Sequence, residues 1–269
     1  MSQRTVFPLP DLPLHALASG TGRDLLLVHG AVCDASAFAP VQDALGTTHR
    51  AIAPSLRHHS PMEWDGDSAY SLATHVDDLD AAYPRGSKQI DLLGHSRGGA
   101  VALLLALRRP DLVRRLILVE PFVMLEKSLL VAPMPRTEIA AAIKDGAALV
   151  RAGDEEAGLA RFLDVVDREG AWAKGPEDTR AMLRRNVQTL PALLASRDVP
   201  VTRDDLSGYA IPTLLIEGAD SPAIFPAMQD ALEIVLPGAR RVRIPGASHF
   251  VFRDAPAAFV AAVSAFMAG

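Results

Sequence analysis

A serine between two glycines, placed between an apolar run and a run of small residues, constrains the fold of this chain more than any other feature. Residues 89–101 read QIDLLGHSRGGAV and contain the pattern G-x-S-x-G centred on Ser96. The apolar residues before the serine predict a short buried strand, and the run 100–107 predicts a buried helix directly after the glycines. Gly94 and Gly98 allow that strand and helix to approach closely. So tight a turn exposes the serine hydroxyl, as in enzymes that use serine as a nucleophile.

The composition indicates a well-packed protein and excludes several function classes. With 269 residues, 49% of them hydrophobic, the chain can bury a large core, either as one domain or as a domain with an insertion. A formal net charge of −5 without any block of Lys or Arg argues against nucleic acid as a partner. The single cysteine, Cys33, excludes an internal disulfide framework. No apolar run approaches the ~18 residues of a membrane span, and prolines interrupt residues 1–15, so we expect a cytoplasmic protein without a membrane partner.

The order of the expected elements favours a mostly parallel sheet flanked by helices. Short apolar runs alternate with helical stretches over the first half of the chain, and this pattern resumes near the C-terminus. The expected strands are 24–28, 50–53, 89–93, 115–119, 213–217 and 241–244. The expected helices of the sheet layer are 38–45, 72–82 and 99–108, and a last helix follows Asp254, which would be its N-cap.

Between residues 121 and 208 the alternation stops and only helices are expected, at 137–151, 154–167 and 176–195. An all-helical insertion between two sheet strands is best explained as a cap over the carboxyl edge of the sheet, where open α/β sheets bind ligands. The alternative is an ordinary peripheral layer of helices. We therefore divide the chain into a first core segment 1–121, a helical cap 122–207 and a second core segment 208–269.

A serine nucleophile needs a base within hydrogen-bonding reach, and a third group that orients the base. Of the eight histidines, His249 is the strongest candidate for the base. It lies in the loop IPGASHF directly after the last expected strand, at the same sheet edge as Ser96. This position also completes the chain order serine, acid, histidine that such an architecture uses.

Taken together, these features resemble the α/β-hydrolase fold superfamily over nearly the whole chain. The matching segments are LLVHG at 26–30, the turn at 94–99, PTLLI at 212–216 and GASHF at 246–250. The resemblance implies the α/β-hydrolase fold and serine-hydrolase chemistry that needs no metal or other cofactor. It also implies an oxyanion hole made by the backbone N–H groups of Ala31 and Arg97.

The acid that would orient His249 is open between two carboxylates. Family members usually carry an aspartate in a G-x-x-D arrangement after the strand that follows the cap, but residues 218–221 read GADS, which places Asp220 one residue early. A second position is the tip of the strand after the nucleophile helix, where zearalenone lactonases and one branch of haloalkane dehalogenases look similar in carrying a glutamate. Here the apolar run 116–119 ends in Glu120. We favour Glu120 and keep Asp220 as the alternative.

The sequence thus predicts a serine hydrolase that acts on small-molecule carboxylic esters or lactones through an acyl-enzyme on Ser96. Serine at this turn suits acyl transfer to water, whereas dehalogenases and epoxide hydrolases of the resembling fold attack with an aspartate. The alternatives are a hydrolase of C–C bonds in diketone-like substrates, with the same residues, and a ligand-sensing or non-catalytic protein of this fold. The sequence leaves open which substrate is used and whether the chain forms a homodimer.

Overall fold

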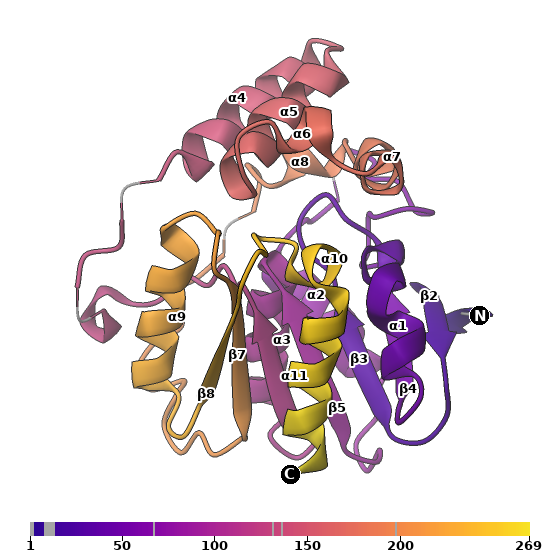
Figure 1. The fold of residues 1–269 in the computed structure, drawn as a ribbon, viewed down its shortest axis with the longest axis vertical. Helices are drawn as coiled ribbons and strands as arrows, with labels where there is room; N and C mark the ends of the chain where they lie inside the picture. The colour runs from indigo at the N-terminus through magenta and orange to yellow at the C-terminus, as the bar shows by residue number, and fades with distance from the viewer. Residues whose placement is uncertain (1–2, 8–13, 67, 131, 136, 197) are drawn as a thin grey trace.

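A central sheet organises the chain in a computed structural model that describes residues 3–7, 14–66, 68–130, 132–135, 137–196 and 198–269 (Figure 1). Within these residues the sheet has eight strands in the order β1-β2-β4-β3-β5-β6-β7-β8. The strands are β1 (Gln3–Phe7), β2 (Leu14–Ser19), β3 (Asp24–Val28), β4 (Arg50–Pro54), β5 (Ile90–His95), β6 (Val113–Val119), β7 (Thr213–Gly218) and β8 (Arg240–Ile244). The pairs β1–β2 and β2–β4 are antiparallel, and the other neighbouring strands pair in parallel.

The predicted mostly parallel sheet is confirmed, since the apolar runs of the sequence form its central strands. Every residue of β5 and of β7 is buried, as expected for parallel strands covered on both faces. β1 and β2 were not predicted. They lie at one edge of the sheet, and in β2 only Leu14 and Ala16 are buried, so this segment has no continuous apolar run.

Helices cover both faces of the sheet because successive side chains of a strand point to opposite sides. Leu25 and Leu27 of β3 pack in one apolar cluster with α1 (Ala39–Leu45) and α11 (Pro256–Ala268). Leu26 and Val28 pack in a second cluster with the helices of the opposite face. Those helices are α2 (Leu72–Ala81), α3 (Arg97–Arg108) and α9 (Ile224–Val235). Shorter helices are η1 (Ala35–Phe38), η2 (Lys127–Leu129) and α10 (Val251–Asp254).

One expectation at the C-terminal end of the chain differs from the structure, and one helix there was not predicted. Asp254 is not the N-cap of the last helix: it ends α10, while α11 begins at Pro256 after the cap residue Ala255. The carboxylate of Asp254 instead accepts a hydrogen bond from the backbone of Ser248 at 3.0 Å. In addition, α9 was not predicted.

Between β6 and β7 the described residues form helices and no sheet strand, as the sequence predicts. We call α4 to α8 the cap helices: α4 (Ile139–Arg151), α5 (Glu155–Val166), α6 (Ala171–Lys174), α7 (Glu177–Arg185) and α8 (Thr189–Ala192). Figure 1 shows them together as a layer beyond one end of the sheet. The predicted helix 176–195 is divided into α7 and α8. The domain boundaries at 122 and 207 stay predictions.

None of the helices in the described ranges is both long and apolar enough to cross a membrane. Residues 1–2 and 8–13, on which the expected absence of a signal peptide partly rests, lie outside the described residues.

Candidate active site

Ser96 occupies a strained turn between β5 and α3, as the sequence predicts. Its backbone has φ 54° and ψ −122°, a region that non-glycine residues rarely adopt. The glycines on either side are needed for close approach: a Cβ on Gly98 would lie 2.3 Å from the backbone oxygen of His29. A Cβ on Gly94 would lie 2.3 Å from the backbone oxygen of Gly98. The turn therefore brings the first residues of α3 directly against the loop after β3.

Three further non-glycine residues in the described ranges have positive φ: His58, with φ 72° in the loop after β4, and Val32 and Glu120 at the same edge of the sheet as Ser96. Val32 has φ 58° in the loop after β3, and Glu120 has φ 45° directly after β6. Such conformations cost on the order of 1–3 kcal/mol each and persist where the surrounding structure fixes them, often at functional sites. Together with Ser96, they mark the carboxyl edge of the central strands as the strained part of the fold.

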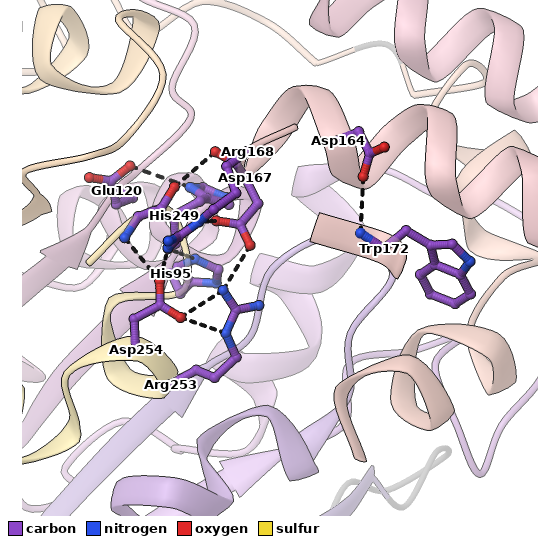
Figure 2. A network of polar contacts seen from close by, with 10 residues as sticks. His95, Glu120, Asp164, Asp167, Arg168, Trp172, His249, Arg253 and Asp254 are labelled. Carbon is purple, nitrogen blue, oxygen red and sulfur yellow. Dashed lines mark hydrogen bonds and ion pairs between the residues drawn. The ribbon is translucent and has the colours of Figure 1, made fainter. Parts of the chain in front are cut away.

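Glu120 and His249 form a buried pair at this edge (Figure 2). Glu120 Oε2 lies 3.4 Å from His249 Nδ1, and the two side chains are 0% and 3% exposed. The other carboxylate oxygen, Oε1, accepts a hydrogen bond from Gly218 N–H at 2.8 Å. On the other side, the ring of Phe225 stacks on the imidazole with 4.1 Å between centroids. The carboxylate and the imidazole are thus fixed relative to each other by β7 and α9.

Asp220, the alternative acid, is exposed, and in the described part of the chain its carboxylate does not contact His249. Its backbone N–H donates to the backbone oxygen of Ala247 at 2.9 Å, so it ties the loop after β7 to the loop that carries His249. Ser221 is the fourth residue of the segment 218–221, where the G-x-x-D arrangement expected from the resemblance would place an aspartate. Its buried hydroxyl lies close enough to Glu120 to favour the charged carboxylate, although it completes no hydrogen bond.

Burial dominates the electrostatics of the pair. It raises the pKa of Glu120 to about 8, against the opposing effect of the Gly218 N–H. Burial also lowers the pKa of His249 to about 4. Both shifts favour the uncharged side chains, because a charge loses its hydration in this environment. An imidazolium formed here during a reaction therefore depends on nearby protein charges for its stabilisation.

The loop after β3 brings backbone N–H groups close to the serine. A Cβ on Gly30 would lie 3.1 Å from Ser96 Cβ, which places the next residue, Ala31, beside the nucleophile. His29 holds this loop, since its Nε2 accepts from Leu56 N–H at 3.0 Å and its Nδ1 donates to Gly30 O at 2.9 Å. Within the described residues, the N–H groups of Ala31 and Arg97 donate to no protein acceptor. They can therefore bind an oxyanion.

A cavity of about 150 Å³ joins Ser96 to the cap helices. Its wall is mainly apolar, with Ile139, Ile143, Phe162 and Val166 from the cap and Phe225 from the core. The Arg97 side chain also lines the cavity, where it pairs with Asp198 at 3.4 Å. A larger hollow of about 950 Å³ lies at the amino ends of β3, β4 and β5, far from the strained turn, and offers no nucleophile of this kind.

In the part of the chain that the structure describes, no hydrogen bond joins Ser96 Oγ to His249, as is common before a substrate binds. The imidazole nevertheless lies next to the cavity, because Phe225 both stacks on His249 and lines the cavity with Ser96. The described residues contain no group of three or more His, Cys, Asp or Glu arranged to hold a metal ion.

Comparison with known proteins decides the family. The profile of the Alpha/beta hydrolase family matches residues 25–263. The chain belongs to the alpha/beta hydrolase family. This family member is 29% identical over 261 residues to the sn-1-specific diacylglycerol lipase ABHD11 of Mus musculus, covering 91% of this chain and 80% of the relative. It is 28% identical over 264 residues to a pimeloyl-(acyl-carrier protein) methyl ester esterase of Aeromonas hydrophila, covering 92% and 96%.

A solved structure agrees with this assignment of the fold. The enol-lactonase of Burkholderia xenovorans LB400 has a TM-score of 0.78, with 20% sequence identity, 98% of this chain and 100% of the other chain covered. The predicted α/β-hydrolase fold is therefore confirmed for this hydrolase-family chain, from the nucleophile turn to the last helix.

Other residues around His249 in this family member were not found from the sequence. His95 Nε2 donates to the backbone oxygen of His249 at 2.9 Å. Asp167, at the end of cap helix α5, and Arg253, in α10, form an ion pair of 2.7 Å beside the same loop. The single useful signal was a histidine inside the G-x-S-x-G pattern. From sequence alone, an aspartate at the end of a helix is expected to be a solvated polar residue. A contact between positions 167 and 253, which are far apart in the chain, cannot be predicted from the residues around either position.

Proposed function

We propose that this protein hydrolyses carboxylic esters or lactones with Ser96 as the nucleophile, His249 as the base and Glu120 as the acid that orients the base. The observation that carries the proposal is the strained Ser96 turn on an apolar cavity, next to a buried pair of His249 and Glu120. The relatives named above, which include an esterase, a lipase and an enol-lactonase, support this substrate class.

In the proposed mechanism, Ser96 Oγ attacks the substrate carbonyl carbon while His249 Nε2 takes the hydroxyl proton. The carbonyl oxygen becomes an oxyanion between the N–H groups of Ala31 and Arg97, which stabilise it where the charge develops. As the C–O bond of the substrate breaks, the imidazolium returns its proton to the leaving alkoxide. A water molecule, activated by the same imidazole, then hydrolyses the acyl-enzyme. Glu120 Oε2 accepts the hydrogen bond from His249 Nδ1–H, so that the unprotonated Nε2 faces the serine.

The small, largely apolar cavity favours a short, uncharged acyl group, since its cap side offers aliphatic and aromatic side chains. The leaving group is not defined by these contacts. Open-chain esters and lactones therefore both fit the proposal.

Labelling with a fluorophosphonate probe, followed by turnover of p-nitrophenyl esters and of small lactones, tests the proposal. We expect one label per chain on Ser96 and many turnovers per active site. Ser96→Ala should lose the label and reduce kcat on the order of a million-fold, as in subtilisin, with an unchanged melting temperature. Activity of more than a few per cent in Ser96→Ala would exclude this mechanism, and a single turnover would indicate a ligand sensor instead.

A further inference from the structure

A polar cluster ties the end of cap helix α5 to the loop that carries the candidate base (Figure 2). We call it the cap clasp: it consists of Asp167 and Arg168 on the cap side and of Ser248, Arg253 and Asp254 on the core side. Ser248 Oγ donates to the backbone oxygen of Asp167 at 2.8 Å, and Arg253 Nη2 donates to Asp167 Oδ2 at 2.7 Å. The cap is thus attached to the residue that directly precedes the base.

Asp167 has a carboxylate oxygen that this clasp does not use. The side chain is 1% exposed, and Oδ1 is buried without a hydrogen-bond partner in the described residues. Its ion pair with Arg168 Nε, at 3.6 Å, is too long for a hydrogen bond. In the view of Figure 2, Glu120 lies on one side of His249 and Asp167 on the other. A buried, incompletely paired carboxylate is costly, so its presence beside a base needs a reason.

The charged groups around the His249 imidazole show how the Asp167 carboxylate affects its protonation. Glu120 faces Nδ1 from β6, and Arg253 lies beside the loop from α10. The negative charge of Asp167 favours the protonated imidazole, whereas the positive charge of Arg253 disfavours it. Although burial opposes it, pairing with Arg253 and Ser248 holds the pKa of Asp167 below its ordinary value, so the carboxylate is charged at neutral pH.

The remaining groups that face the pair do not supply this charge. His95, on β5, is uncharged at neutral pH because burial lowers its pKa well below the ordinary value. Glu217 acts from β7 on Glu120, which burial keeps near neutral. Asp254, in the clasp, has no effect on the pKa of His249 comparable to that of Asp167.

We propose that Asp167 is a positioning residue of the catalytic base: its buried carboxylate, which comes from the cap and is held by Arg253 of the core, stabilises the His249 imidazolium that forms when Ser96 attacks. This inference rests on the proposed function. Glu120 orients the imidazole from the core, and Asp167 provides a negative charge from the cap. The cap then contributes to the chemical step as well as enclosing the substrate.

The test compares Asp167→Asn with the control Asp254→Asn, measured by histidine NMR titration and by the pH profile of kcat/KM. In Asp167→Asn we expect the apparent pKa values of the His249–Glu120 pair to fall by about one unit, because a nearby negative charge is removed. We expect kcat to fall about tenfold at neutral pH, and KM to stay within about twofold, since Asp167 does not line the cavity. Asp254→Asn removes the carboxylate charge that pairs with Arg168 and Arg253 but keeps an amide oxygen that can accept from Ser248 N–H. It also keeps the Asp167 charge, and it should leave these pKa values unchanged.

Unchanged pKa values in Asp167→Asn, or an equal shift in both variants, would overturn the proposal, because either result would show that the clasp acts only through structure. Asp167→Glu should restore most of the shift, and Asp167→Ser replaces Asp167→Asn if the amide does not fold. The titration of the His249 signal, assigned by its loss in His249→Asn, does not require turnover. It therefore tests Asp167 even if Ser96 labelling shows that the proposed function is wrong.

Discussion

Replacing Glu120 by glutamine should remove most of the activity, because the hydrogen bond from Gly218 fixes which atom of the amide faces His249. The side chain keeps its shape, but only one of its terminal atoms can still accept a hydrogen bond. Gly218 N–H donates to Oε1 at 2.8 Å, so the amide oxygen belongs at that position. The amide NH₂ then faces His249 Nδ1, which lies 3.4 Å from Oε2 in the parent. Nδ1 must accept, the ring proton moves to Nε2, and the base toward Ser96 is lost.

The magnitude follows from the two orientations of the amide. In the orientation that satisfies Gly218, the wrong tautomer costs ~10,000-fold, as for the corresponding amide in a serine protease. In the flipped orientation the correct tautomer is kept, but a buried N–H loses its acceptor and faces another donor, at a cost of up to about 3 kcal/mol. That energy corresponds to about 150-fold. We therefore expect kcat/KM to fall between about 100-fold and about 10,000-fold.

The assay is hydrolysis of a p-nitrophenyl ester, with the melting temperature measured on the same samples. Since burial raises the pKa of Glu120 to about 8, a neutral side chain is tolerated there and the melting temperature should not fall. Asp220→Asn is the matched control: Asp220 is exposed and only its backbone binds Ala247, so its activity should stay within about tenfold of the parent, a barrier change of ~1.4 kcal/mol. A loss below tenfold in Glu120→Gln together with a collapse in Asp220→Asn would refute the reasoning and move the acid to Asp220.

Three further outcomes are expected. Phe162→Leu widens the cavity and should change the order of preference among esters of different acyl length. Leu149→Val, in a cap residue that does not line the cavity, should leave this order unchanged. The same order in both variants would argue against a cap that selects substrates. Gly98→Ala should lower stability by about 1–3 kcal/mol, measured by urea unfolding, because its Cβ would lie 2.3 Å from His29 O. The melting temperature should drop as the pH falls below 6.5. Burial lowers the pKa of His59, His75 and His95 well below this ordinary value, so that these histidines take up protons only in the unfolded chain. A constant melting temperature from pH 7 to pH 5 would contradict this.

The nucleophile turn and the parallel strands could be predicted from sequence because their signals are local. A strand that is buried on both faces is mainly apolar, and a turn in which a Cβ would overlap a neighbouring backbone oxygen must contain glycine. The edge strand β2 has only alternate buried residues, so its sequence resembles that of a loop.

The choice of acid and the role of the cap could not be predicted in the same way. Glu120 and Asp220 both follow a strand at the carboxyl edge, and spacing alone does not tell which one reaches His249. The structure separates them by burial, since Glu120 is enclosed and Asp220 is exposed. Asp254 is followed by an apolar helix and therefore resembled an N-cap, whereas its partner is the backbone of Ser248, which only the folded loop brings close.

The hydrogen bond from Gly218 to Glu120 joins positions that are 98 residues apart and that lie on either side of the helical insertion. The paired strands β6 and β7 therefore close this part of the site behind the insertion, whatever sequence is inserted between them. We expect that the cap helices can be exchanged in a laboratory chimaera while Ser96, Glu120 and His249 keep their places. A transplanted cap would bring a new substrate preference, and it would recover the full rate only if it again carried an acidic residue where Asp167 now meets Arg253.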